Sequence, residues 1–195
     1  MRAPSATIVG ANVYLRPPRL SDVAAFSAAV RASAALHRGW TTAPRTPERF
    51  ARFVSRYAAR GKAPSHAGFL VLRREDDALV GVYNFSEIVR GAFQSAFLGY
   101  FAFSPLAGSG LMSEGMALAL DVAFRQLKLH RIEVNIQPKN ARSLALAERL
   151  GFTREGYSRR YVKIAGRWRD HVRFAMLAED WRALRRKHRI ARSPR

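Results

Sequence analysis

The segment 93–129 constrains the fold more than any other part of the chain. Its first part, Phe93–Phe103, is rich in aromatic residues and predicts a strand, which Pro105 ends because proline has no amide proton for a sheet ladder. Gly108 and Gly110 follow, and apolar residues then recur every three or four positions over Leu111–Leu129, which predicts a long helix. The free N–H groups at the start of such a helix can accept a phosphate or pyrophosphate, so this loop is a candidate anion site.

The loop does not match either common nucleotide motif. A P-loop needs G-x-x-x-x-G-K-[ST], and no lysine stands near Gly108 or Gly110. A dinucleotide fingerprint needs a third glycine where Ser113 stands, and the next carboxylate that could serve it, Glu133, lies beyond a further strand. Nucleotide hydrolysis and NAD binding are therefore both excluded as interpretations of this loop.

The rest of the chain alternates strand and helix patterns, which predicts an α/β fold with a mixed sheet. We expect one domain over about 13–181, followed by a basic helical tail over about 182–195. The expected elements are a strand at Val13–Arg16, a helix capped by Ser21 or Asp22, a helix over Pro47–Arg60 capped by Thr46 and ended by Gly61, a hairpin of Phe69–Leu72 and Leu79–Phe85, a strand at Arg131–Ile136, a helix over Asn140–Leu150, two antiparallel strands within Phe152–Leu177 that turn near Ala165-Gly166, and a helix over Glu179–Arg195.

Composition removes several classes of protein. The chain of 195 residues has no cysteine, which excludes disulfides, cysteine-ligated zinc, iron–sulfur clusters and a cysteine nucleophile. No apolar run approaches the ~20 residues that span a bilayer, and the first residues show no secretory signal. We therefore expect a cytoplasmic protein without a membrane partner.

The charge is strongly positive. Lys and Arg total 34 against 14 Asp and Glu, so the formal net charge is +20. A field of this sign attracts nucleic acid, ribosomes or phosphorylated cofactors. Most of the cations are arginine, however, and this bias is also typical of a GC-rich genome. The seven Arg and Lys after Trp181 fit either an RNA contact or a solvated tail.

A second motif follows the strand at Arg131–Ile136. Asn140 and Ser143 form an N-x-x-S at a predicted helix start, and Leu150-Gly151-Phe152 ends that helix. Residues three apart on a helix point to the same side, so the pair can act together. Taken singly, Asn140 also fits a helix cap and Ser143 a solvated first-turn residue.

With this motif the chain resembles the GNAT superfamily of acyl-CoA N-acyltransferases, most closely the ribosomal-protein-alanine N-acetyltransferases. The resemblance covers about 13–181 and is strongest after residue 81. It rests on GYFAF (99–103), the loop 107–112, NFSEIVRGAFQSAFLGY (84–100), HRIEVNIQPKNARS (130–143), LGFTREGY (150–157) and GRWRDH (166–171).

The resemblance implies a single-domain GNAT-like fold, with a mostly antiparallel sheet, a splayed strand pair and flanking helices. Acetyl-CoA would lie in the splay and no metal would be needed. The main chain of Phe101, Ala102 and Phe103 would bind pantetheine, Asn140 and Ser143 the cofactor arm, and Asn84, Glu87 and Tyr100 the acceptor. The pyrophosphate would lie on the backbone amides of the loop residues Gly108, Ser109, Gly110, Leu111 and Met112.

Three positions depart from the superfamily pattern. Ala107 replaces the Gln or Arg that opens the usual [QR]-x-x-G-x-[GA] loop, and Met112, which resembles the ribosomal branch, closes it. Ala147 stands where many members carry a tyrosine acid, and the resemblance gives that role to Ser143 instead. For the general base we leave Glu87, Asp170 and His171 open. Glu114 is expected to satisfy backbone groups in the first turn of its helix, where its charge suits the dipole.

The resulting expectation is direct transfer of an acetyl group from acetyl-CoA to a protein N-terminal α-amine, with an N-terminal alanine of a ribosomal protein as the expected acceptor. One alternative is a GNAT enzyme for a small-molecule amine, against which the +20 charge argues because such amines are often polycations. The other is a ribosome- or RNA-binding protein that uses the acyltransferase fold as a platform.

Overall fold

The computed structural model describes residues 7–57 and 64–191, with side chains up to Lys187. Eight strands form one sheet in the order β1-β2-β3-β4-β5-β6-β8-β7. Their bounds are β1 Ile8–Val9, β2 Val13–Arg16, β3 Ala67–Arg73, β4 Leu79–Val89, β5 Ser95–Ala102, β6 Arg131–Ile136, β7 Thr153–Ile164 and β8 Arg167–Leu177. The α-helices are α1 Val23–Ala32, α2 Ala34–His37, α3 Pro47–Tyr57, α4 Leu111–Asp121, α5 Ala141–Arg149 and α6 Ala178–Ala191.

The sheet is antiparallel except at one junction. β5 and β6 run parallel and pair only at Ser95–Phe97 with Arg131–Glu133. Beyond these pairs β5 continues to Ala102 and β6 to Ile136, but the two strands no longer pair with each other, so they diverge. The predicted mixed, mostly antiparallel sheet with a splayed pair is confirmed.

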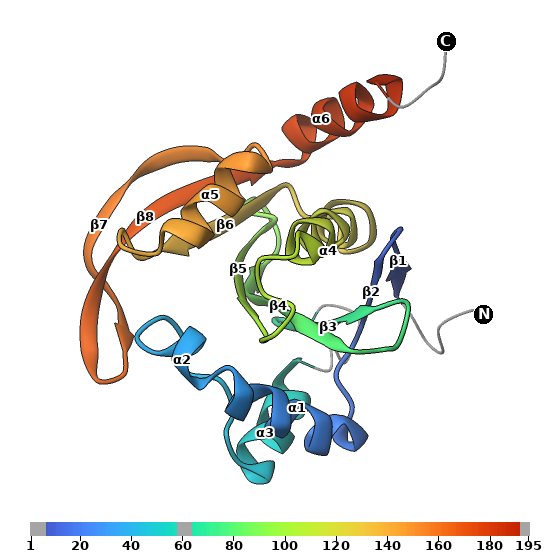
Figure 1. The fold of residues 1–195 in the computed structure, drawn as a ribbon. Coiled ribbons are helices and arrows are strands. Elements are labelled where there is room, and N and C mark those ends of the chain that lie inside the picture. The colour runs from blue at the N-terminus through green and yellow to red at the C-terminus, as the bar shows by residue number, and fades with distance from the viewer. Residues whose placement is uncertain (1–6, 58–63, 192–195) are drawn as a thin grey trace.

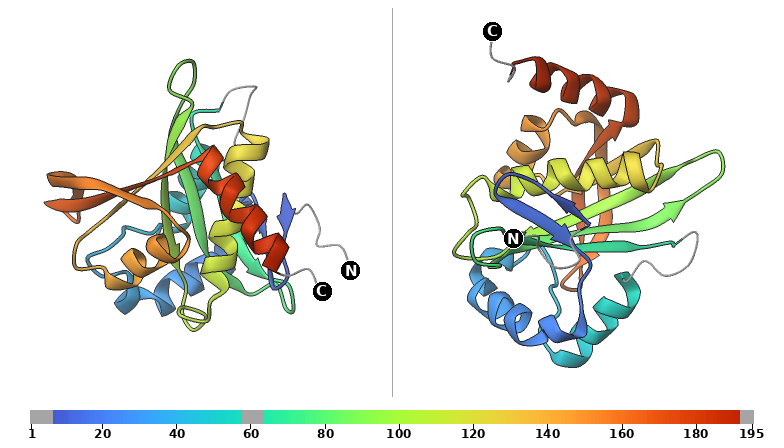
Figure 2. Two further views of the ribbon diagram at one scale, coloured as in Figure 1. Left: turned by 90° about the horizontal axis from the view of Figure 1, so that it is seen from above. Right: turned by 90° about the vertical axis from the view of Figure 1, so that its right-hand side faces the viewer.

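Helices cover both faces of the sheet. α1, α2 and α3 lie on one face, whereas α4, α5 and α6 lie on the other (Figures 1 and 2). The larger buried cluster joins α4 to the sheet around Tyr83, Met116 and Ile132. The smaller cluster joins α1 and α3 to the sheet around Phe26 and Phe50.

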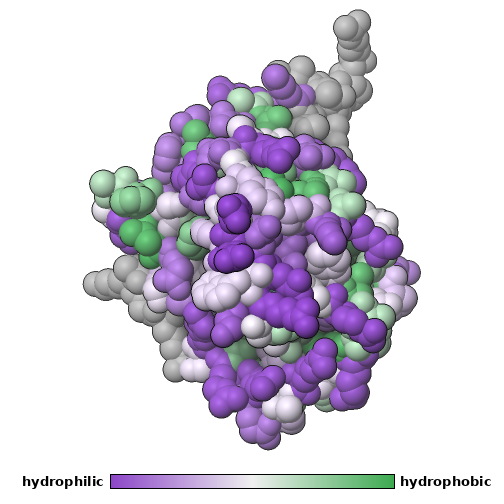
Figure 3. Space-filling view, turned by 90° about the vertical axis from the view of Figure 1, so that its left-hand side faces the viewer, coloured by the Kyte–Doolittle hydropathy of each residue, from purple (hydrophilic) through white to green (hydrophobic). Residues whose placement is uncertain are grey.

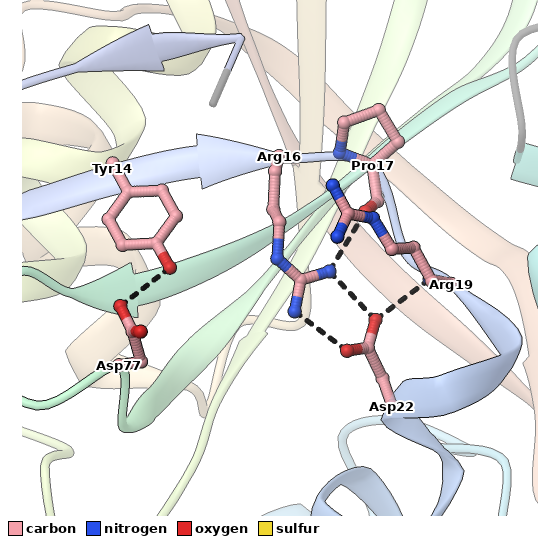
Figure 4. A network of polar contacts seen from close by, with 6 residues as sticks. All are labelled: Tyr14, Arg16, Pro17, Arg19, Asp22 and Asp77. Carbon is pink, nitrogen blue, oxygen red and sulfur yellow. Dashed lines mark hydrogen bonds and ion pairs between the residues drawn. The ribbon is translucent and has the colours of Figure 1, made fainter. Parts of the chain in front are cut away.

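A polar network fixes α1 against β2 (Figure 4). Asp22 stands at the N-cap position of α1, but its side chain makes no cap hydrogen bond there. It instead forms a bidentate ion pair with Arg16, at 2.7 and 2.8 Å, and accepts from the Arg19 amide at 2.7 Å. Tyr14 donates to Asp77 at 2.7 Å beside this network. The expected cap of α1 by Ser21 or Asp22 is therefore wrong: Ser21 lies inside the turn Leu20–Asp22, and the half-buried Arg16 competes for the Asp22 carboxylate.

The Thr46 cap is confirmed, since its hydroxyl accepts from the Arg49 amide at 3.3 Å. The helix pattern predicted to Leu129 ends earlier. α4 stops at Asp121 and passes into a π-turn, η2, over Val122–Gln126, which has one extra residue per turn. β1, α2 and the 3₁₀ turn η1 at Leu20–Asp22 were not expected from the sequence. The parts of the expected elements that fall in 58–63 and 192–195 lie outside the described residues.

The C-terminal helix is packed against the body of the protein. Trp181 is 5% exposed and donates its indole N–H to Asp121 of α4 at 2.9 Å. Arg185 pairs with the other oxygen of Asp121 at 3.0 Å. Asp121 is thus a buried side chain with one partner on each of two successive turns of α6.

Within the described ranges no helix is long and apolar enough to cross a membrane.

Candidate functional site

The divergence of β5 from β6 leaves backbone groups of β5 free. Phe103 donates its amide to Val80 at 2.8 Å, so Phe101 and Phe103 direct their backbone groups toward β4. Tyr100 and Ala102 alternate with them and face the open side of the splay. Of the three residues predicted to bind pantetheine, only Ala102 therefore has its N–H on the open side, and Tyr100 joins it.

His37 occupies one of these open-side groups. Its Nε2 donates to the Ala102 carbonyl at 2.8 Å, and its ring packs edge-on against Phe101. Burial lowers the pKa of His37, although the bond to Ala102 opposes this, so the ring stays neutral near pH 7. His37 was not a predicted site residue, because it belongs to no motif and α2, the helix that carries it, was not expected from the sequence.

The loop before α4 has the open backbone that an anion requires. Gly108 and Gly110 have φ of +89° and +87°, and a Cβ added at either glycine would meet nothing within 4 Å. Ser109, Ser113 and Glu114 donate their amides within the loop and first turn. The amides of Leu111 and Met112 have no such acceptor in the described structure, so they are free for a ligand.

Buried contacts hold the first turn of α4 in place. Tyr83 donates to the Met112 carbonyl at 2.5 Å, and burial raises the pKa of Tyr83 well above its usual value, so it remains a donor. The Met112 side chain packs where a Cβ on Gly81 would lie, which explains how methionine is accommodated at this position.

Glu114 bonds backbone groups outside its own helix, unlike the expectation. It accepts from the amides of Asn12 at 2.8 Å and Val13 at 3.3 Å. Partial burial alone would raise the pKa of Glu114, but a hydrogen bond from the Asn12 side chain at 2.9 Å, together with those from the two amides, holds it below its usual value. Glu114 therefore ties the β1–β2 turn to α4.

An arginine that the sequence analysis missed lies beside the loop. Arg149, in the last turn of α5, donates to the Ser113 hydroxyl of α4 at 3.2 Å. The guanidinium therefore stands next to the α4 N-terminus, where the arginine or glutamine usual at position 107 is missing. A cation one residue before Leu150-Gly151 was the only available signal.

The start of α5 brings three predicted residues together. The Asn140 side chain accepts from the Ser143 amide at 3.3 Å, which confirms its capping role. Tyr100, on β5, donates across the splay to the Ser143 carbonyl at 3.3 Å. Burial raises the pKa of Tyr100 to about 12, so its hydroxyl stays protonated. The Ser143 side chain lies within hydrogen-bond reach of the Tyr100 hydroxyl, and this contact opposes the shift.

A row of residues crosses four strands on the opposite face of the sheet. Asn84 pairs with Gly99, and Asn135 pairs with Arg173. Gly99 and Asn135 each stand two residues beyond the last β5–β6 pair, Phe97 with Glu133, so both point to the same face as that pair, on either side of the divergence. The Oδ1 atoms of both asparagines are buried and lack a hydrogen-bond partner among the described residues. This row, which we call the amide row, offers two unused acceptors beside the point of divergence.

Asn84 was a predicted site residue, whereas Asn135 and Arg173 were not. Their signal was the polar alternation in RIEVNI and the same alternation near Arg173 on β8. Asn84, Gly99 and Asn135 lie in segments on which the resemblance rests, whereas Arg173 does not. The row itself depends on strand register between distant segments.

The three candidate bases differ in availability. The Glu87 carboxylate is 62% exposed and lies 3.8 Å from His66, at a bulge of β4 near the level of Phe97. Asp170 accepts from the Tyr157 hydroxyl at 2.6 Å and the Arg160 amide at 2.7 Å, and these bonds lower the pKa of Asp170. Asp170 is therefore a poor proton acceptor.

His171 is 3% exposed and bonds the Arg169 carbonyl through Nδ1 at 3.0 Å. Burial lowers the pKa of His171, although its bond to Arg169 opposes the shift. Of the three candidates, Glu87 alone presents an exposed carboxylate without a strong partner.

The comparisons with known proteins agree with this geometry. A family model for the acetyltransferase (GNAT) domain matches residues 12–153. The chain belongs to the GNAT acetyltransferase family. The splayed pair, the glycine loop and the N-terminus of α4 all lie within the matched residues.

Named relatives include ribosomal-protein acetyltransferases. The probable N-acetyltransferase YjcK of Bacillus subtilis is 40% identical over 127 residues, which are 65% of this chain and 70% of that protein. The ribosomal protein uS5 alanine N-acetyltransferase of Escherichia coli is 43% identical over 107 residues, 55% of each chain. The chain thus spans about half the length of this second relative.

A solved structure extends the likeness to the fold. Mycobacterium smegmatis RimJ, in complex with CoA-disulfide, superposes with a TM-score of 0.79 at 30% identity and covers 86% of this chain and 83% of that chain. The free open-side groups of β5, the uncrowded glycine loop and Arg149 fit a CoA thioester. Within the described ranges no cluster of three or more His, Asp or Glu is arranged to hold a metal.

Proposed function

We propose that this GNAT enzyme acetylates a protein N-terminal α-amine in the cytoplasm, with an N-terminal alanine of a ribosomal protein as the acceptor. The named function of the Escherichia coli relative supports this acceptor. The observation that carries the proposal is the amide row, because it presents acceptors for N–H groups beside the splay and a guanidinium rather than a carboxylate.

Acetyl-CoA would lie along the open side of β5. Tyr100 and the Ala102 N–H would bond the pantetheine arm, and the amides of Leu111 and Met112 would bond the pyrophosphate. Arg149 would add a charge-assisted hydrogen bond to a phosphate, in place of the side chain that Ala107 lacks. α5 runs about 9 Å between Ser143 and Arg149, so the two residues would contact different parts of the ligand.

The acceptor would approach from the α1–α3 face. Asn84 and Asn135 would accept hydrogen bonds from the amine or the first peptide N–H groups. Arg173 would donate to a peptide carbonyl. Because Gly99 has no side chain, and a Cβ there would meet nothing within 4 Å, the amine can approach the splay between the two asparagines.

The proton chemistry asks little of the protein. An α-amine has a pKa of ~8, so a useful fraction is neutral near pH 7.5. Glu87, acting through water, would take the remaining proton. The bound thioester supplies the acetyl group, and Ser143 would donate a proton to the departing sulfur.

A small-molecule acceptor is the second candidate. The fold neighbours include a spermidine N-acetyltransferase from Vibrio cholerae at 20% identity, which is a likeness of fold alone. Arg173 in the amide row makes this face unfavourable for a polycation, because it forms no ion pair with the described residues. We therefore favour the peptide acceptor.

Thermal unfolding tests the cofactor part of the proposal. The protein is melted with acetyl-CoA, CoA or ATP at matched concentrations and at two salt concentrations. A ligand at 100 times its Kd stabilises by about 2.7 kcal/mol. A shift that acetyl-CoA and CoA cause in high salt, and ATP does not, supports the site. Equal shifts that vanish in salt contradict it, because they reflect attraction to the +20 surface alone.

Acetylation of short peptides tests the acceptor. Peptides that begin with alanine are compared with the same peptides blocked at the N-terminus but carrying a lysine, and with spermidine. Acetylation of the free α-amine only supports the proposal. Faster acetylation of spermidine overturns it in favour of the small-molecule alternative.

A further inference from the structure

The β7–β8 hairpin extends past the rest of the sheet. β6 pairs with β8 over Val172–Leu177, so Arg167–His171 of β8 pair with β7 alone. Figures 1 and 2 show this part projecting away from the body of the protein. We call residues 158–171 the distal ribbon. Within the distal ribbon, β7 and β8 pair with each other and with no further strand of the described structure.

The distal ribbon is strongly cationic. Its charged residues are the cations Arg159, Arg160, Lys163, Arg167 and Arg169 and the single acid Asp170. Asp170 is occupied by Tyr157 and the Arg160 amide, which fixes the bulge between Ser158 and Val162. None of the cations forms an ion pair with the described residues. Their charge is therefore available to an external anion.

The same segment exposes large aromatic side chains. Trp168 is 60% exposed and Tyr161 38%, and Tyr157 at the base of the ribbon is 49% exposed. Lys163 and Trp168 are cross-strand partners, so their side chains share one face at a Cβ separation of about 5 Å. The surface on this side of the molecule is mainly hydrophilic, with paler and apolar side chains between (Figure 3).

The C-terminal helix is basic but lacks this combination. Arg182, Arg186 and Lys187 are exposed, but Arg185 is paired with Asp121. Among its described side chains, to Lys187, the one aromatic is the buried Trp181. α6 can attract polyanions by charge, but it offers no surface on which a base could stack.

We propose that the distal ribbon binds single-stranded RNA, with a base stacked on Trp168 and phosphates held by Lys163 on the same face and by Arg167, which points to the other face beside the turn. Exposed aromatics among free cations suit single strands, whose bases are accessible, and not duplexes, whose bases are already stacked. An acidic peptide would use the cations but would leave the indole in water. The choice of RNA rests on the proposed function, since ribosomal proteins are assembled with RNA.

The position of the ribbon fits this role. Val172, where the ribbon meets the sheet, pairs with Ile136, and its neighbour Arg173 belongs to the amide row. The side chain of Gln137 donates to the Gly39 carbonyl at 2.8 Å at the same end of β6. RNA on the ribbon would therefore lie next to the approach of the acceptor.

Fluorescence anisotropy with a fluorescein-labelled 12-nucleotide oligo(U) RNA and the full chain, without acetyl-CoA or peptide, tests the proposal. Trp168→Ala removes the stacking surface at constant charge. Lys163→Ser with Arg167→Ser removes two charges from the ribbon, and Arg182→Ser with Arg186→Ser removes two from α6 as the matched control. All these side chains are exposed, and circular dichroism verifies that each variant folds.

We expect Trp168→Ala to weaken RNA binding by about 5- to 150-fold and Trp168→Phe to retain most of it, as one stacked base implies. The ribbon charge variant should also lower the slope of log affinity against log salt by about 1.4, whereas the α6 variant changes affinity less than threefold. Equal losses in the two charge variants with no effect of Trp168→Ala would overturn the proposal and indicate diffuse attraction.

Two further measurements test the chemical class of the ligand. Tighter binding of duplex RNA than of oligo(U), or equal binding of single-stranded DNA, contradicts a site selective for single-stranded RNA. A Trp168→Ala variant with normal RNA affinity but a raised KM for the acceptor peptide identifies the ribbon as a peptide surface and overturns the RNA site. Because acetyl transfer is absent from the binding assay, failure of the RNA site leaves the proposed acetyltransferase activity untouched.

Discussion

Replacement of Ser143 by alanine separates proton donation from cofactor binding. Ser143 is half-buried in the first turn of α5, and its backbone is held by Asn140 and Tyr100 at 3.3 Å each. Its side chain contacts the Tyr100 hydroxyl, which also donates to the Ser143 carbonyl, so Ser143→Ala removes one contact and leaves that backbone bond in place. Alanine is the better helix former by about 0.5 kcal/mol, which offsets part of a hydrogen bond worth about 1 kcal/mol, so the free energy of unfolding should stay within about 1 kcal/mol of wild type.

The expected loss is therefore confined to the chemical step. A positioned general acid contributes about 10²- to 10⁴-fold, which corresponds to about 2.7–5.4 kcal/mol of activation free energy. We expect kcat to fall by this factor while the Kd of acetyl-CoA changes less than threefold. Ser143→Cys should recover part of kcat, because a thiol with a pKa near 8.5 can donate a proton to the departing sulfur.

The assay measures thiol release with an alanine-starting peptide, and acetyl-CoA affinity separately by titration calorimetry. Ser27→Ala is the matched control, since Ser27 is also a half-buried helical serine and lies on α1, on the opposite face of the sheet. Equal losses in kcat and acetyl-CoA affinity, or a kcat loss below threefold, would refute the assignment of Ser143 as the acid.

Three further predictions concern the scaffold of the site. Gly108→Ala forces φ of +89° on alanine, so it should cost about 1–2 kcal/mol of unfolding free energy and also weaken acetyl-CoA binding. Gly166→Ala, at φ of +80°, is the control: it should cost the same in stability and leave acetyl-CoA affinity unchanged. Equal acetyl-CoA affinities of the two variants would contradict the loop assignment. Asp121→Ala leaves the indole N–H of Trp181 buried and unpaired and should cost about 2–4 kcal/mol in urea unfolding, against less than about 1.5 for Asp121→Asn, which keeps an acceptor; identical costs would show that the Trp181 bond is unimportant. Burial lowers the pKa of His37 below the unfolded value near 6.5, so the unfolded state binds more protons in acid, and the stability that His37 contributes should be full above pH 6.5 and fall below it. His37→Gln should flatten that fall in urea midpoints measured from pH 7.5 to 5. A slope of stability against pH that is the same in the variant would rule out His37 as a contributor.

Local chemistry made much of the cofactor side predictable. Pro105 and the two loop glycines determine backbone geometry within a few residues, so the strand, loop and helix were located from the sequence. The Asn140 cap was predictable for the same reason, because it bonds a residue three positions away. The length of α4 was not, since a π-turn depends on how the helix packs rather than on its periodicity.

The acceptor side was harder to predict because it depends on strand register. Asn84 and Asn135 are 51 positions apart in sequence, and they share a face only because β4, β5 and β6 align as they do. The contact between Arg149 and Ser113 likewise joins two helices whose relative placement the sequence does not state. The alternation in β6 showed which residues share a face, but not what lies opposite them.

The divergence of β5 from β6 also bears on self-association. An unpaired strand edge is a template on which strands of other chains can add, which is why most sheets protect their edges. Here the exposed stretch begins after Phe97, where β6 still pairs, and ends at Ala102, whose carbonyl is taken by His37. A strand of another chain could pair only with the few positions between these two residues, because the edge is occupied at both ends. A pantetheine arm is narrow enough to bind over this short stretch. The open edge of β5 is thus long enough for the proposed ligand but too short to pair stably with a strand of another chain.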